Sequence, residues 1–260
     1  MFKHYFAGLF LITILSGCAT TSQSSYNNES TRELVMKNSG NFQDLITHYK
    51  EQLKQNDTRD TREKLATAYL DYGDPESALF TISQLNQGSP QVSSLLIQAY
   101  AEFELGDLPS SKDSAEQAYA LDKQNAEIEN LLGVIYAANG DLGQARDFFN
   151  LARAHFYSDI KIKNNLAVLD IIEQDYSSAI ERLLPIYTND EADDQVVANL
   201  TLAMAKSDNL ELMKQVLKPK FTDKEIQQRY LSLRKLKTTQ PENQLETSVT
   251  ANQALFEGAR

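Results

Sequence analysis

The sequence predicts an all-α fold, a superhelix of about five to six helical hairpins that spans residues 31–237. Three observations predict it. Turn signals recur at a nearly constant spacing, the segments between them repeat one order of large and small apolar residues, and only 10 glycines and 6 prolines interrupt 260 residues. A constant period of roughly 20 to 50 residues is typical of arrays in which each hairpin buries its apolar face against the next.

The amino-terminal segment has the pattern of a bacterial lipoprotein signal peptide over residues 1–17. Lys3 precedes an apolar stretch, residues 6–15, that is too short to span a bilayer. The stretch ends in Leu-Ser-Gly-Cys, which resembles the lipobox whose cysteine receives acyl chains such as palmitate. Cys18, the one cysteine of the chain, is therefore the predicted lipid attachment site. The alternative is an ordinary cleaved signal with a chance cysteine.

The residues after Cys18 predict where the protein goes. Ala19 stands where an aspartate would retain an enterobacterial lipoprotein at the inner membrane, so resemblance to those sorting rules implies the outer membrane. Residues 18–30 are rich in Ser, Thr, Asn and Gln, a composition that cannot bury a core and predicts a flexible tether. We therefore expect a lipid-anchored protein of the outer membrane that faces the periplasm.

Four turn signals divide the middle of the chain into nearly equal units. They lie at Gly73, Gly106, Gly140 and Gln174. Their spacings are 33, 34 and 34 residues. In three of the four units a leucine beside a small residue marks the first helix, as at Leu132-Gly133, and an alanine such as Ala145 marks the second. The second unit has Gln98 and Ser111 at these two places. This order resembles the tetratricopeptide (TPR) repeat, in which small residues let two helices approach closely.

Both ends of the array depart from the repeat pattern. A degenerate first pair of helices is expected over residues 31–56, with its turn at Gly40. A capping helix is expected over residues 222–237, where apolar residues share one face and Thr222 or Asp223 can cap the first turn.

The carboxy-terminal tail, residues 238–260, is expected to be disordered because it has few large apolar residues. Leu255 and Phe256 are the exception and could form a short segment that docks on the array. A fully solvated tail is the simpler alternative.

Composition and motif content argue against several functions. The net charge of -11 repels phosphate, which predicts no nucleic-acid partner. The histidines beyond the signal, His48 and His155, lie far apart, and no metal-binding motif, glycine-rich phosphate loop or nucleophile elbow occurs. The acidic cluster Glu191, Asp193 and Asp194 lacks the spacing of a calcium loop. The sequence therefore predicts no enzyme, no catalytic residues, no cofactor and no metal.

The first helices of such an array line its concave face, where a peptide or protein segment is expected to bind. The predicted groove residues are Tyr100, Phe103, Asn130, Val134, Lys161, Asn164, Asn165, Val168 and Asn199. Asn165 and Asn199 occupy equivalent positions, 34 residues apart, where each amide offers a donor and an acceptor to a bound backbone. The alternatives are that these asparagines cap local backbone or face water, and that Tyr100 and Phe103 belong to the core.

Two successive first helices contain the sequences NNLA, residues 164–167, and ANLTLA, residues 198–203. Together with the lipobox and the helical segment 223–236, they resemble TadD, the lipoprotein of the tight-adherence (Flp pilus) assembly system. The resemblance implies a pilotin-like accessory protein of the outer membrane that helps the pilus secretin to localise or assemble. The implied partners are this secretin or other pilus-assembly components.

Two other functions stay open on the sequence alone. Pilotins of type IV pili are also TPR lipoproteins of the outer membrane and are the alternative within the same functional class. A cell-envelope scaffold that binds peptidoglycan-synthesis partners is the alternative from a different class. Genes for a pilin, a prepilin peptidase, a secretin and a secretion ATPase beside this one would favour the Flp pilus.

Overall fold

The computed structural model of the protein describes residues 21–236, with side chains from residue 30 onward. Within this range the chain forms thirteen α-helices and no strand. The helices are α1 (Thr21–Asn38), α2 (Phe42–Gln55), α3 (Arg59–Tyr72), α4 (Pro75–Asn86), α5 (Val92–Glu104), α6 (Leu108–Leu121), α7 (Ala126–Ala138), α8 (Leu142–Ala154), α9 (Asp159–Ile172), α10 (Tyr176–Thr188), α11 (Asp194–Lys206), α12 (Leu210–Leu217) and α13 (Asp223–Lys235). The signal peptide, Cys18 and the segment with Leu255 and Phe256 lie outside the described residues.

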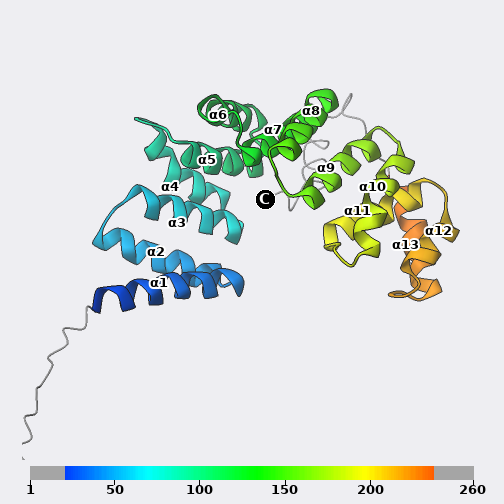
Figure 1. The fold of residues 1–260 in the computed structure, drawn as a ribbon, viewed down its shortest axis with the longest axis horizontal. Helices are drawn as coiled ribbons and strands as arrows, with labels where there is room; N and C mark the ends of the chain where they lie inside the picture. Colours follow the sequence, from blue (N-terminus) through cyan, green and yellow to red (C-terminus); the bar gives the residue numbers. More distant parts are fainter. Residues whose placement is uncertain (1–20, 237–260) are drawn as a thin grey trace, which may run out of the picture.

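Consecutive helices pair into six hairpins, from α1–α2 to α11–α12, and α13 packs on the last pair. The hairpins follow one another along an arc (Figure 1), with α5, α7 and α9 towards its inner side and α6 and α8 on its outer side. This arrangement confirms the predicted all-α superhelix of about five to six hairpins.

The turn inside each hairpin is built from a left-handed residue next to a helix cap. The left-handed residues are Gly40 (φ 68°), Gly73 (83°), Gly106 (79°), Gly140 (84°), Gln174 (65°) and Asp208 (57°). After Gly140, the Asp141 carboxylate accepts the backbone N–H of Gln144 at 3.1 Å, which caps α8. Since glycine tolerates positive φ and aspartate caps helices, the Gly-Asp signal in the sequence marks the period of the fold.

Small residues let the paired helices touch. A Cβ atom at Gly133 on α7 would lie 2.6 Å from the ring of Phe149 on α8. Phe149 and Ala145 are fully buried. One apolar cluster extends from Met36 to Ile172 and a second from Ala167 to Tyr230, and α9 contributes to both. The core therefore consists of two clusters that meet at α9.

The ends of the array differ slightly from expectation. Helix α1 begins at Thr21, inside the segment expected to be a tether, so the helical part starts earlier than residue 31. At the other end, Thr222 is the N-cap of α13 and forms a capping box with Glu225, so Thr222, and not Asp223, is the capping residue. Ile226 and Tyr230 bury the inner face of α13 against the last hairpin.

Candidate protein-binding surface

The predicted groove residues are buried rather than exposed, with one exception. Lys161 is half-buried. The buried ones, with their exposed fractions, are Tyr100 7%, Phe103 9%, Asn130 1%, Val134 1%, Asn164 7%, Asn165 2%, Val168 0% and Asn199 3%. The expectation that these side chains are exposed on the concave face is therefore wrong for all but Lys161. For Tyr100 and Phe103 the core alternative holds.

The four asparagines form two pairs that link successive first helices. Asn165 on α9 donates from Nδ2 to Oδ1 of Asn130 on α7 at 2.9 Å. Asn199 on α11 donates in the same way to Asn164 on α9, also at 2.9 Å. Both bonds are buried, so each amide satisfies a neighbouring amide across the interface between hairpins.

The sequence placed these asparagines on the correct first helices, but the face that carries them packs against the neighbouring first helix instead of lining an open groove. Each first helix contacts the next but one helix in the chain, α7 against α9 and α9 against α11. Asn164 and Asn165 stand two residues and one residue before the packing leucine, Leu166, and therefore face this neighbouring helix instead of an open groove. Buried amides need partners, and the neighbouring asparagine supplies one.

A polar group around Lys161 remains accessible beside these pairs. Burial lowers the pKa of Lys161, and the carboxylates of Glu127 and Asp193 act against this shift. Burial also raises the pKa of Glu127, opposed by Lys161, and raises the pKa of Tyr157 to about 12, with Glu127 adding to it. Asn130 Nδ2 donates to the Tyr157 hydroxyl at 3.4 Å. These groups from α7, α9 and the loop before α9 can offer a partner both charges and a hydroxyl.

An ion-pair cluster that the sequence analysis missed joins the fourth and fifth hairpins. Asp170 on α9 is 3% exposed. It accepts from Arg146 on α8 at 3.1 Å and from Arg182 on α10 at 2.6 Å. Glu173 also pairs with Arg146, at 2.5 Å. The available signal was an aspartate inside the apolar run LAVLDII, since a charge is rarely buried without a partner.

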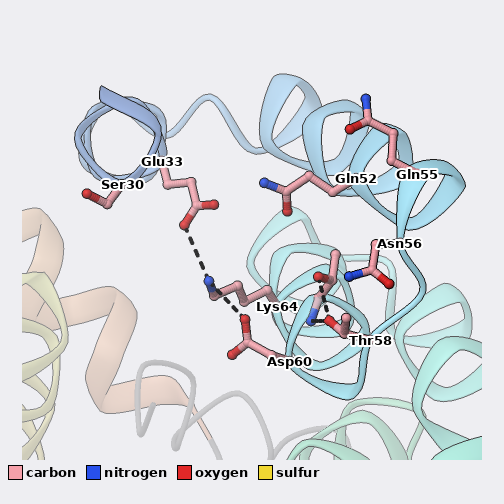
Figure 2. Close-up of a pocket in the computed structure, with 9 residues that line it drawn as sticks. Ser30, Glu33, Gln52, Gln55, Asn56, Thr58, Asp60 and Lys64 are labelled. Atoms are coloured by element: carbon pink, nitrogen blue, oxygen red, sulfur yellow. Dashed lines mark hydrogen bonds and ion pairs between the residues drawn. The ribbon is translucent and has the colours of Figure 1, made fainter. Parts of the chain in front are cut away.

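A polar pocket of about 290 Å³ lies at the amino-terminal end of the array, between α1, α2 and α3. Figure 2 shows Lys64 reaching from α3 towards Glu33 on α1 and towards Asp60. The Lys64 ammonium lies 3.1 Å from Asp60 and 3.7 Å from Glu33. Amide and hydroxyl groups, those of Gln52 and Thr58 among them, complete the lining. Because two carboxylates already neutralise the lysine, the pocket is a poor site for an anion.

Two further observations concern the described residues 21–236. They contain no group of three or more His, Cys, Asp or Glu side chains arranged to hold a metal ion. None of their helices combines the length and apolar character needed to cross a membrane.

One residue of the acidic cluster Glu191, Asp193 and Asp194 caps a helix. The Asp193 carboxylate accepts the N–H of Val196 at 2.8 Å and so stabilises the first turn of α11.

Comparisons with known proteins support the fold. No known protein family matches the sequence by its profile, and no curated protein matches it. Among solved structures the chain is similar to TTC0263, a thermophilic TPR protein of Thermus thermophilus. The TM-score is 0.55, with 16% identity over 81% of this chain and 99% of that one. This likeness, together with the helical hairpins, shows an all-α TPR superhelix.

Two other solved structures match with lower scores. The crystal structure of MamA gives a TM-score of 0.47 and 20% identity, over 56% of this chain and 87% of that one. The Cut9–Hcn1 hetero-tetramer of the APC/C gives 0.40 and 12% identity, over 81% of this chain and 52% of that one.

Proposed function

We propose that this protein is a protein-binding scaffold whose working surface includes the polar group around Lys161. The observation that carries the proposal is the arrangement of six hairpins along one arc, with Lys161, Glu127 and Tyr157 together beside the joined first helices. A partly buried lysine next to a carboxylate and a hydroxyl suits the charged and polar groups of a peptide segment. No group with catalytic geometry is needed for this role.

We further propose that the scaffold is a lipid-anchored, pilotin-like factor of Flp pilus assembly at the outer membrane, with the pilus secretin as its partner. The lipobox ending at Cys18 and the resemblance of residues 164–167 and 198–203 to TadD support this role. The asparagines in those segments hold the hairpins together. The resemblance to TadD therefore supports a similar stacking of the hairpins. More accessible residues such as Lys161 then make the contact with the secretin.

The test reverses the charge of Lys161 and compares it with a matched lysine. Lys163 stands two residues away on the same helix and pairs with Asp159 at 2.6 Å. Lys161→Glu should weaken binding of the purified lipidated chain to the purified secretin by about tenfold, because a desolvated charge at an interface is among its strongest contributors. Lys163→Glu should leave binding unchanged. Cells with Lys161→Glu should also contain fewer secretin multimers and fewer pili.

Three results would change the proposal. Equal binding by both variants would remove the surface around Lys161 from the function. Failure of the unsubstituted chain to bind the secretin would reject the pilus role. Binding of the unsubstituted chain to a peptidoglycan-synthesis enzyme, lost in Lys161→Glu, would keep the scaffold and favour the envelope alternative. Circular dichroism of each variant distinguishes lost contact from lost folding.

A further inference from the structure

The loop between α8 and α9 presents an aromatic side chain to solvent. Phe156 is 96% exposed, the highest value among the large apolar residues described, and its backbone is left-handed, with φ 67°. A bulky residue adopts this conformation unfavourably. At the equivalent position of the next hairpin, 34 residues later, the left-handed residue is Asp190 (φ 57°), a short polar residue that tolerates it. The turn itself therefore has no need of an aromatic ring.

Both neighbours of Phe156 are anchored, so the loop holds the ring out rather than letting it fold back. The His155 Nδ1 atom lies 2.8 and 3.0 Å from the two carboxylate oxygens of Glu129, which is fully buried on α7. The Tyr157 hydroxyl accepts from Asn130, also on α7, at 3.4 Å. The Tyr157 N–H donates to the carbonyl of Ala152 at 2.9 Å. A strained, exposed and fixed aromatic side chain is typical of an interaction anchor.

The same chain carries an apolar pocket that can accept such a ring. It lies between the start of α6 and the end of α7, and its volume is about 300 Å³. Leu108, Pro109, Ile135 and Tyr136 form its apolar walls, and Lys112, Asp113, Glu116 and Asn139 complete the lining with charged and polar groups. An apolar cavity of about 150 Å³ is enough to hold a benzene molecule, so this pocket has room for the side chain of a phenylalanine.

Phe156 cannot reach the pocket of its own chain. The pocket lies at the edge of the superhelix that carries the turns inside hairpins, next to Gly106 and Gly140. Phe156 lies in a connection between hairpins, at the opposite edge. One helix length separates the two edges, and the 13 residues of α8 span about 20 Å. The ring and the pocket can therefore meet only between two molecules.

The charges beside the two surfaces are complementary. Arg153, exposed, stands one turn before Phe156. Lys112, Asp113 and Glu116 line the pocket, and the Lys112 ammonium pairs with Glu116 at 3.7 Å, so Asp113 is the carboxylate that can face an incoming cation. We propose that Phe156 of one copy enters the pocket between α6 and α7 of a second copy, with Arg153 facing Asp113. The ring and the pocket lie at opposite edges of the chain, so a contact made in one direction at each step is head to tail and can repeat along a row of copies, whereas a reciprocal contact would close a dimer. This self-association is independent of the function proposed above.

The first test replaces the ring with a residue that suits the turn. The full lipidated chain in detergent should associate with rising concentration in sedimentation velocity experiments. Phe156→Asn should weaken this association about tenfold or more, while its urea midpoint stays the same or rises, because asparagine tolerates left-handed backbone. The control is Phe80→Asn, since Phe80 on α4 is 74% exposed, and it should associate like the unsubstituted chain. A lowered urea midpoint in Phe156→Asn would show that the ring packs in the array and would overturn the proposal.

The second test asks whether the ring and the pocket are the two halves of one contact. Asp113→Arg keeps the ring but places a cation at the pocket, so this variant alone should also fail to associate. A mixture of Phe156→Asn with Asp113→Arg should form dimers that grow no further, because one variant supplies the pocket and the other the ring. A monomeric unsubstituted chain at submillimolar concentration, or a mixture without dimers, would overturn the proposal.

Discussion

At the scale of single residues, several buried polar side chains link neighbouring hairpins. Asn130 with Asn165 and Asn164 with Asn199 join first helices, and Asp170 joins α9 to α8 and α10. Each amide pair needs the neighbouring hairpin in place, and so does the contact of Asp170 with Arg146. A shifted register would leave amides or a carboxylate buried without a partner, which is strongly unfavourable. These residues therefore favour one stacking of the repeats over others.

The asparagine pair supplies a prediction at this scale. Asn165→Ala should lower the free energy of unfolding by about 1–3 kcal/mol, because it leaves the buried Oδ1 atom of Asn130 without its donor. Asn150→Ala, an exposed position on α8, should change it by less than about 0.5 kcal/mol. Urea unfolding followed by circular dichroism measures both. In a double-mutant cycle, Asn130→Ala and Asn165→Ala should be non-additive; strict additivity would show that the pair does not interact.

At the scale of the elements, the distance between paired helices is set by where small residues stand. Gly133 lets α7 lie directly against the ring of Phe149 on α8. Ala145, Ala167 and Ala179, each fully buried, stand at the small positions of the same repeat pattern. The larger residues then fill the space between hairpins, so that two apolar clusters, which meet at α9, run along the array.

Two alanine substitutions on the same hairpin should act with opposite sign. Gly133→Ala should destabilise the protein by about 1–3 kcal/mol, since the new Cβ would lie 2.6 Å from a fully buried ring that cannot move aside. Gly143→Ala on α8 should be neutral or stabilising by up to about 1 kcal/mol, because the nearest atom is 3.8 Å away and alanine favours the helix. Thermal unfolding compares them, and a stabilising Gly133→Ala would contradict this packing.

At the scale of the whole molecule, the structure is an extended arc of hairpins in which each hairpin packs on its neighbours. Its accessible features lie at the two edges of the array: the polar group around Lys161 adjoins the ring of Phe156 through Tyr157, and the pocket between α6 and α7 lies at the opposite edge. A membrane anchor would concentrate such a scaffold on one surface.

The anchor itself gives a prediction at this scale. Cys18→Ala should abolish labelling by a palmitate analogue in cells and release the chain from the outer-membrane fraction, because buried acyl chains contribute about 0.8 kcal/mol per CH₂. Ala19→Asp is the matched control, and it should keep the label but move the protein to the inner membrane. Label on the Cys18→Ala protein would contradict the lipobox. An unchanged location of Ala19→Asp would contradict the sorting rule.

The repeat itself could be predicted from the amino-acid sequence alone. The spacing of Gly73, Gly106, Gly140 and Gln174 indicated the period, since left-handed turns and helix caps depend on residues close together in the chain. The small residues Gly133 and Ala145 were also identified from the pattern alone. Local preferences and one-face periodicity are encoded within a single hairpin, so these features needed no tertiary information.

What each helix face meets became clear only from the tertiary structure. Asn165 and Asn199 were assigned to the correct helices, but periodicity does not show how closely the next first helix approaches, and that helix buries them. The two arginines that pair with Asp170 lie on two other helices, α8 and α10. Phe156 and the pocket beside Tyr136 lie at opposite edges of the array. Exposure and pairing depend on contacts between residues far apart in the chain, and one chain's pattern does not specify those distances.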